Sequence, residues 1–132
     1  MESTSEVFKE RLEKIKSFQS QGISLYQDQF GPTHLIREIL EPFDEGKSIK
    51  LAGRMMTKRV HGKSAFADLK DETGKIQIYA KLDVLGEKDF HFFEQLDLGD
   101  ILGIEGTLFM THKGEKTLKV ERFALLSKIV RI

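Results

Sequence analysis

Cysteine is absent from this sequence of 132 residues. Its absence excludes disulfides, thiolate zinc sites and cysteine nucleophiles. No stretch approaches the roughly 18 consecutive apolar residues that a transmembrane helix needs. Residues 1–5 are polar and show no secretory signal. We therefore expect a cytoplasmic protein with one domain and one modest core.

Net charge is also missing, because 21 lysines and arginines balance 21 acidic residues. The overall charge therefore gives no reason to expect a polyanionic partner. Between residues 50 and 81, however, eight basic residues stand against three acidic ones. Such a basic strip can bind phosphates locally. A solvated face of a sheet would have the same composition, so charge alone leaves both interpretations open.

The first third of the chain has the pattern of helices. Residues 5–21 carry apolar side chains at intervals of three and four, which predicts an amphipathic helix. A second, shorter helix is expected over residues 33–41, with Thr33 as its N-cap and Pro42 ending it. We therefore assign residues 1–47 to an N-terminal helical extension.

From residue 48 onward the apolar period falls to two, which is typical of strands. The expected strands span residues 48–58, 64–70, 75–81, 101–111 and 115–126. A helix over residues 87–96 separates the third strand from the fourth. This order predicts a mainly β protein: a five-stranded OB-fold Greek-key barrel over residues 48–127, preceded by one or two helices. A generic five-stranded sheet packed on helices is the alternative.

Alternation also assigns the faces of the second and third strands. The apolar sets should line the barrel: Ala65, Ala67, Leu69, Ile76, Ile78 and Ala80. That places Phe66 outside, beside Gln77 and Tyr79, among basic residues. An exposed aromatic ring next to an amide and several cations is typical of a base-stacking platform. Alternatively, the N-terminal helices cover Phe66, and Gln77 is an ordinary solvated residue.

The sequence shows no pattern typical of a catalytic site. The four histidines are scattered without metal-ligand spacing. No glycine-rich phosphate loop follows a strand, and no nucleophile elbow is present. We therefore expect no catalytic residue, metal site or cofactor in this chain, and we interpret it as a binding module.

Several segments resemble class II lysyl-tRNA synthetases of the bacterial type. The similar segments are GRMMTKR at 53–59, GKSAF at 62–66, GKIQIY at 74–79, DLGDILG at 97–103, GTLF at 106–109, GE at 114–115 and RLEKI at 11–15. They are spread from residue 11 to residue 115, so the resemblance extends over most of the chain. The Met-Met and Asp-Leu-Gly-Asp blocks are specific to this group. The Met-Met segment argues against the related aspartyl and asparaginyl branch, which shares the stacking aromatic residue and the glutamine.

The resemblance implies an anticodon-binding domain whose partner is the anticodon stem-loop of lysine tRNA. In that family the middle uracil stacks on the strand-two aromatic residue, here Phe66, and the strand-three glutamine, here Gln77, hydrogen-bonds its edge. Arg59 and Glu115 resemble further anticodon contacts. We expect Lys58, Lys63, Lys75 and Tyr79 to complete the RNA-binding surface, with the lysines contacting phosphates.

Family members continue into a catalytic domain that activates lysine with ATP and magnesium, and they are homodimeric. Here residues 128–132 would begin the linker to that domain, whose motifs are absent from this sequence. We therefore expect no ligase activity from this chain alone, and a monomer is compatible with its size. Three rival functions stay open: binding of single-stranded nucleic acid without base preference, the anticodon domain of an aspartyl- or asparaginyl-tRNA synthetase, and a protein–protein adaptor.

Overall fold

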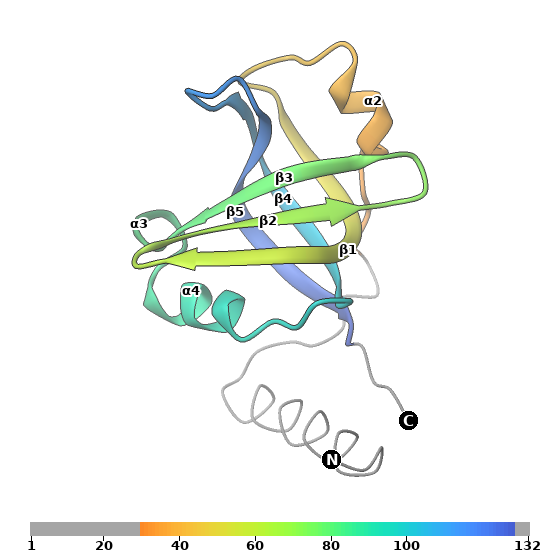
Figure 1. Ribbon diagram of the computed structural model, residues 1–132. Coiled ribbons are helices and arrows are strands. Elements are labelled where there is room, and N and C mark those ends of the chain that lie inside the picture. The colour runs from red at the N-terminus through yellow and green to blue at the C-terminus, as the bar shows by residue number, and fades with distance from the viewer. Residues whose placement is uncertain (1–29, 129–132) are drawn as a thin grey trace.

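Five strands close into a barrel within residues 30–128, the part of the chain that the computed structural model describes (Figure 1). The strands are β1 (Ser48–His61), β2 (Ser64–Lys70), β3 (Lys75–Lys81), β4 (Ile101–Met110) and β5 (Lys116–Ser127). Their order around the barrel is β1-β2-β3-β5-β4. All neighbours are antiparallel except β3 and β5, which run parallel. The predicted OB-fold barrel is confirmed.

Three helices accompany the strands within the described residues. They are α2 (Ile36–Leu40) before β1, and α3 (Leu82–Leu85) and α4 (Glu87–Glu94) between β3 and β4. The sequence predicted α4 but not the single turn of α3. The helix expected over residues 5–21 lies outside the described residues. None of the helices in residues 30–128 is long and apolar enough to cross a membrane.

Strand β1 is longer than predicted, because residues 59–61 continue its pairing with β2 up to the turn. The strand pairs with two partners in succession. Its first half pairs with β4, and from Arg54 onward it pairs with β2, as far as His61 opposite Ser64. A bulge between Met55 and Thr57 separates the two halves of the register with β2. Bulges bend and coil a strand. Here the bend lets one strand belong to both sides of a small barrel.

The residues predicted to line the barrel are buried. Ala65, Ala67, Leu69, Ile78 and Ala80 are 0% exposed, and Ile76 is 2% exposed. Helix α4 adds Phe90 and Phe93 to this core. It also buries Phe92, which stacks on Phe123 of β5 with 5.5 Å between ring centroids. Helix α4 thereby packs against the barrel wall.

Two features hold β4 and β5 in place. A Cβ atom on Gly106 would lie 1.8 Å from the carbonyl oxygen of Lys119, so only glycine permits the approach of the two strands there. At the end of β5, the buried Lys128 ammonium contacts the carboxylates of Asp97 at 2.5 Å and Asp100 at 2.7 Å. A buried lysine needs such partners.

The cap of helix α2 differs from the prediction. Thr33 does not cap the helix; its hydroxyl instead accepts a hydrogen bond from the Lys50 amide at 3.0 Å. The helix begins at Ile36, whose amide donates to the Asp71 carboxylate at 2.9 Å. The next amide, of Arg37, donates to the Thr73 hydroxyl at 3.0 Å. The cap therefore comes from the β2–β3 turn, which no local sequence pattern reveals.

The Asp71 carboxylate is itself held by several donors. Burial raises its pKa, but hydrogen bonds from the Thr73 hydroxyl and from the backbone of Ile36, Thr73 and Gly74 outweigh burial. The pKa of Asp71 therefore lies below its ordinary value. The charged form of this side chain consequently stabilises both the β2–β3 turn and the start of α2.

Asp71→Ala should lower the free energy of unfolding by about 1–2 kcal/mol near neutral pH, because a helix cap and a turn lose their acceptor. The contribution is complete above the unfolded pKa, near 3.8, and is lost as pH falls through the lower folded value. Urea melts at about pH 7 and about pH 2.5 should show the difference from wild type shrinking with acid.

The neighbouring exposed Glu72 supplies the control, and Glu72→Ala should change stability by less than about 0.5 kcal/mol. A stability difference between wild type and Asp71→Ala that stays constant over this pH range would contradict the charged cap.

Candidate nucleic-acid interface

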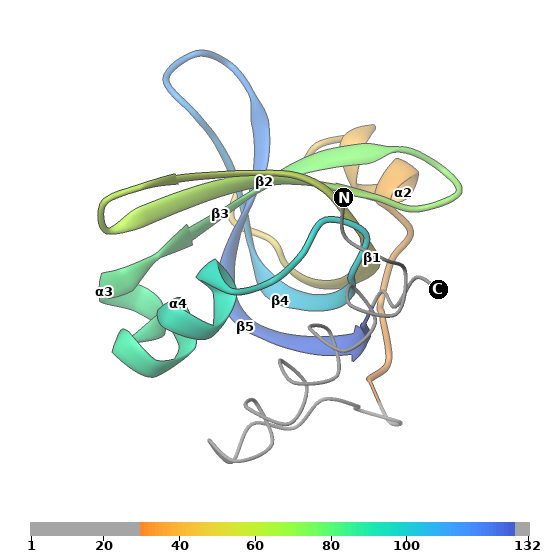
Figure 2. The same ribbon diagram turned by 60° about the horizontal axis from the view of Figure 1, so that its bottom comes forward.

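A hollow of about 420 Å³ lies at one end of the sheet that β1, β2 and β3 form. Its lining residues are Arg59, His61, Phe66, Gln77, Thr111, His112, Lys113 and Glu115. They come from three strands and from the β4–β5 turn, which Figure 2 shows projecting beyond β2 and β3. The volume falls within the roughly 300–1,000 Å³ of small-molecule sites.

The hollow brings together four residues that the sequence placed in an RNA site: Arg59, Phe66, Gln77 and Glu115. Strand register explains the first three. Arg59 lies opposite Phe66, and Phe66 lies opposite Tyr79, two residues from Gln77 on the same face of β3. Side chains that are directly opposite in an antiparallel pair project to the same side. The face assigned from alternation is therefore the face that carries the hollow.

Phe66 is half-buried, with its ring supported by a neighbouring strand. The Tyr79 ring lies 4.7 Å away between centroids, tilted by 30°. Phe109 of β4 continues the row, 6.0 Å from Tyr79. Helix α2 lies at the far end of the β2–β3 hairpin, near residues 71–74 (Figure 1). The Phe66 side chain lines the hollow at the other end of the hairpin. Tyr79 does not line the hollow and acts as a support for Phe66.

Gln77 occupies the centre of a polar chain across the sheet. Its amide oxygen accepts from the Arg59 guanidinium at 3.3 Å, and its amide nitrogen donates to the Thr117 hydroxyl at 3.1 Å. Thr117 is 0% exposed and donates in turn to the carbonyl of Glu115 at 3.1 Å. Each amide atom retains one further hydrogen-bonding position. Gln77 is therefore held in place while it can still bind a ligand.

The sequence predicted Glu115 as the first residue of the last strand, but it lies in the turn before β5. Strand β5 begins at Lys116, because hydrogen bonds between Glu115 and Thr111 close the β4–β5 turn before it. The Thr111 hydroxyl donates to the Glu115 carboxylate at 3.1 Å and accepts from the Glu115 amide at 3.0 Å. This side chain is exposed at the hollow's rim, with its position fixed by Thr111.

The predicted lysines do not gather in the hollow. Lys58 points elsewhere, because its ammonium donates to the carbonyls of Glu94 at 2.6 Å and Leu96 at 2.5 Å, at the end of α4. Lysines commonly satisfy the last carbonyls of a helix. Lys63 in the β1–β2 turn and Lys75 at the start of β3 are exposed and do not line the hollow.

Sequence reasoning missed five residues of this region: His61, Thr111, His112, Lys113 and Thr117. The loops before β2 and before β5 are those that OB folds use for oligonucleotides. That rule could have identified His61 and the residues of the β4–β5 turn. Arg59 and Lys113 are cations, and Glu115 is the one carboxylate lining the hollow. A polyanion can therefore approach its rim.

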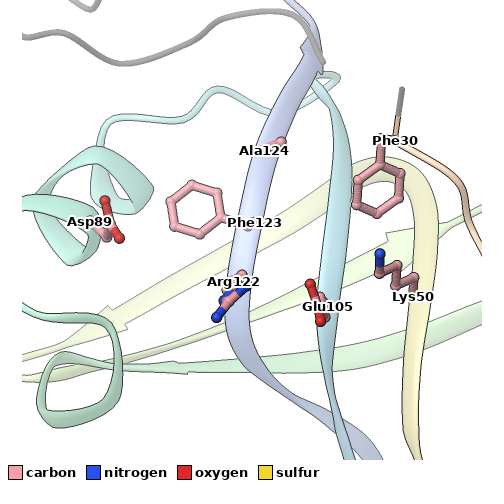
Figure 3. Close-up of a pocket in the computed structure, with 7 residues that line it drawn as sticks. All are labelled: Phe30, Lys50, Asp89, Glu105, Arg122, Phe123 and Ala124. Carbon is pink, nitrogen blue, oxygen red and sulfur yellow. The ribbon is translucent and has the colours of Figure 1, made fainter. Parts of the chain in front are cut away.

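A second hollow, of about 380 Å³, shares no residue with the first (Figure 3). Lys50 and Arg122 are balanced there by Asp89 and Glu105. The Phe123 ring points towards α4, where it meets Phe92 and Phe93. Balanced charge and a ring engaged in packing favour a structural role for this hollow.

Metal binding has no support in the part of the chain that the structure describes. Residues 30–128 contain no group of three histidine or acidic side chains arranged to hold a metal ion.

Comparison with known proteins agrees with this geometry. Residues 49–126 match the family described as OB-fold nucleic acid binding domain. A lysine--tRNA ligase of Carboxydothermus hydrogenoformans is 45% identical over 129 residues, covering 96% of this chain and 26% of that protein. That of Thermoanaerobacter pseudethanolicus is 45% identical over 134 residues, covering 99% and 27%. That of Moorella thermoacetica is 41% identical over 133 residues, covering 99% and 27%.

The chain thus spans about a quarter of the length of the relatives it matches. The similarity to lysyl-tRNA synthetases indicated by the sequence is confirmed, and it extends over nearly all of the chain. The closed five-stranded barrel is the fold of the matched family, and all residues that line the hollow lie within the matched range 49–126. This chain belongs to the family of OB-fold nucleic-acid-binding domains.

Proposed function

We propose that this domain binds the uridine-rich anticodon loop of lysine tRNA, with Phe66 as the stacking platform and Gln77 as the group that hydrogen-bonds the middle base. The observation that carries the proposal is the position of the Gln77 carboxamide, held by Arg59 and Thr117 in a hollow that Phe66 also lines. We propose a tRNA as the ligand because the relatives are named lysine--tRNA ligases.

The chemistry of the hollow suits an unstacked uracil. A carboxamide offers a donor and an acceptor side by side, and uracil presents an N–H between two carbonyl oxygens. A half-buried aromatic ring offers a stacking surface for any base. The ring therefore supplies affinity, whereas the amide supplies the preference between bases.

The other predicted contacts take different parts in the proposal. Arg59 and Glu115 lie within reach of a bound nucleotide in the hollow. Lys63 and Lys75 are exposed outside it, where a phosphate backbone could pass, and their role stays a prediction. Lys58 has no part in it, because its ammonium is engaged by the carbonyls at the end of α4.

The remaining properties implied by the resemblance are proposals for the full-length family enzyme. These are attachment of lysine to tRNA with ATP and magnesium, a homodimeric assembly and a cytoplasmic location. No residue of the hollow is assigned to the ligase reaction.

A tRNA anticodon hairpin with UUU should bind more tightly than one with UCU. Cytosine replaces the N–H donor and one carbonyl acceptor of uracil by an acceptor and a donor, so the contact with Gln77 is lost. The cost should be roughly 1–3 kcal/mol, that of a buried polar group left unpaired. Fluorescence titration of both hairpins, with a changed stem pair as the control, measures it. Equal affinities would instead indicate an OB module without base preference.

Phe66→Ala should weaken hairpin binding by about 1–3 kcal/mol, because a base loses its stacking surface. Loss of the Tyr79 ring contact should cost stability by about 0.5–1.5 kcal/mol. The same hairpin titration and a urea melt measure the two effects.

Ile78→Ala is the matched control, from the opposite face of the adjacent strand. Its side chain is 0% exposed, so the substitution should destabilise the barrel by about 2–5 kcal/mol. Binding by the fraction that stays folded should be unchanged. If Phe66→Ala proves the more destabilising of the two while binding RNA normally, the proposed site is wrong.

A further inference from the structure

We infer that Thr117 fixes which way round the Gln77 carboxamide faces, and that it thereby sets the preference for uracil over cytosine. The inference rests on the proposed function, because it assigns to a buried residue the control of the group that contacts the base. Thr117 lies beneath Gln77 at 0% exposure and does not line the hollow. It is a positioning residue.

The two neighbours of Gln77 impose the same orientation on its amide. On one side, the Arg59 guanidinium has only N–H donors, so the atom 3.3 Å from it is the amide oxygen. On the other side, the single proton of the Thr117 hydroxyl is donated to the Glu115 carbonyl at 3.1 Å. The hydroxyl can therefore only accept, and the amide nitrogen faces it at 3.1 Å.

Turning the amide over would break this arrangement on both sides. The amide nitrogen would face the N–H groups of Arg59, and the oxygen would face a hydroxyl whose proton is already used. Arg59 is exposed and has room to withdraw, whereas Thr117 is enclosed between β3 and β4 and cannot. Thr117 is therefore the neighbour that resists reversal of the amide most effectively.

A fixed amide distinguishes the two pyrimidines. Uracil presents an N–H donor and an adjacent carbonyl acceptor. These groups pair with the amide oxygen and the amide nitrogen of Gln77, respectively, when the amide has the fixed orientation. Cytosine presents a ring-nitrogen acceptor and an amino donor, which match the same carboxamide only after it has turned over. If the amide could turn freely, it would bind either base. Preference for uracil therefore requires the neighbour that holds the amide, in addition to the amide itself.

Thr117→Val tests the inference, because it removes the hydroxyl while keeping the size and the branched shape of the side chain. Thr117→Ser is the matched control, because it keeps the hydroxyl. Each variant is titrated with the UUU and UCU hairpins alongside wild type, after a urea melt confirms that it is folded. If Thr117→Val does not fold, Thr117→Ala, which introduces no new contact, takes its place.

In Thr117→Val the ratio of UUU to UCU affinity should fall by roughly fivefold or more, the effect of one hydrogen bond. Part of the fall should come from tighter binding of the UCU hairpin, which mere loosening of the site would not produce. Thr117→Ser should keep the wild-type ratio.

The outcomes separate the inference from the proposed function. A Thr117→Val protein that keeps the wild-type ratio overturns the inference and leaves the proposed function standing. Equal loss of the ratio in the valine and serine variants also overturns it, because the hydroxyl would then not be the cause. Wild-type protein that binds both hairpins equally overturns the proposed function, and the inference with it.

Discussion

The parallel contact between β3 and β5 brings together the groups on which the site depends. Three residue pairs form this contact, and one of them places Gln77 beside Thr117, 40 residues away in the sequence. The same closure brings the β4–β5 turn, with Glu115, to the edge of the hollow. The bulge in β1 and the close approach at Gly106 give the strands the curvature that a small barrel requires.

A site built in this way holds its proposed base-contacting groups in place through contacts within the protein. The stacking ring and the amide stand on strands, and hydrogen bonds from other strands fix the amide. The cations are carried by turns and strand ends, where they can follow a flexible phosphate backbone. Preorganised contacts reduce the entropy lost on binding. The fixed amide is therefore suited to distinguishing bases in the proposed complex, and the exposed cations to contacting its phosphates.

Period-two alternation was sufficient to predict the bounds of β2 and β3, their buried faces and the outward position of Phe66 and Gln77. Each of these depends on neighbouring residues alone. The errors involve partners that are far apart in sequence. Lys58 caps α4, 36 and 38 residues away from its acceptors, and Asp71 caps α2 from 35 residues away. Thr117 shows no sequence signal, because its role exists only after the barrel has closed.

The side-chain amide of Gln77 reports most directly on the proposed contact between a fixed carboxamide and the middle base. An NMR titration of nitrogen-15-labelled protein with the UUU hairpin would follow its two amide protons together with the backbone amides. We expect large shifts for the Gln77 side chain and for backbone amides near Phe66 and in the β4–β5 turn, with Leu118 in the closed barrel unchanged. Shifts centred on the hollow beside Phe123, with the Gln77 amide unmoved, would contradict it.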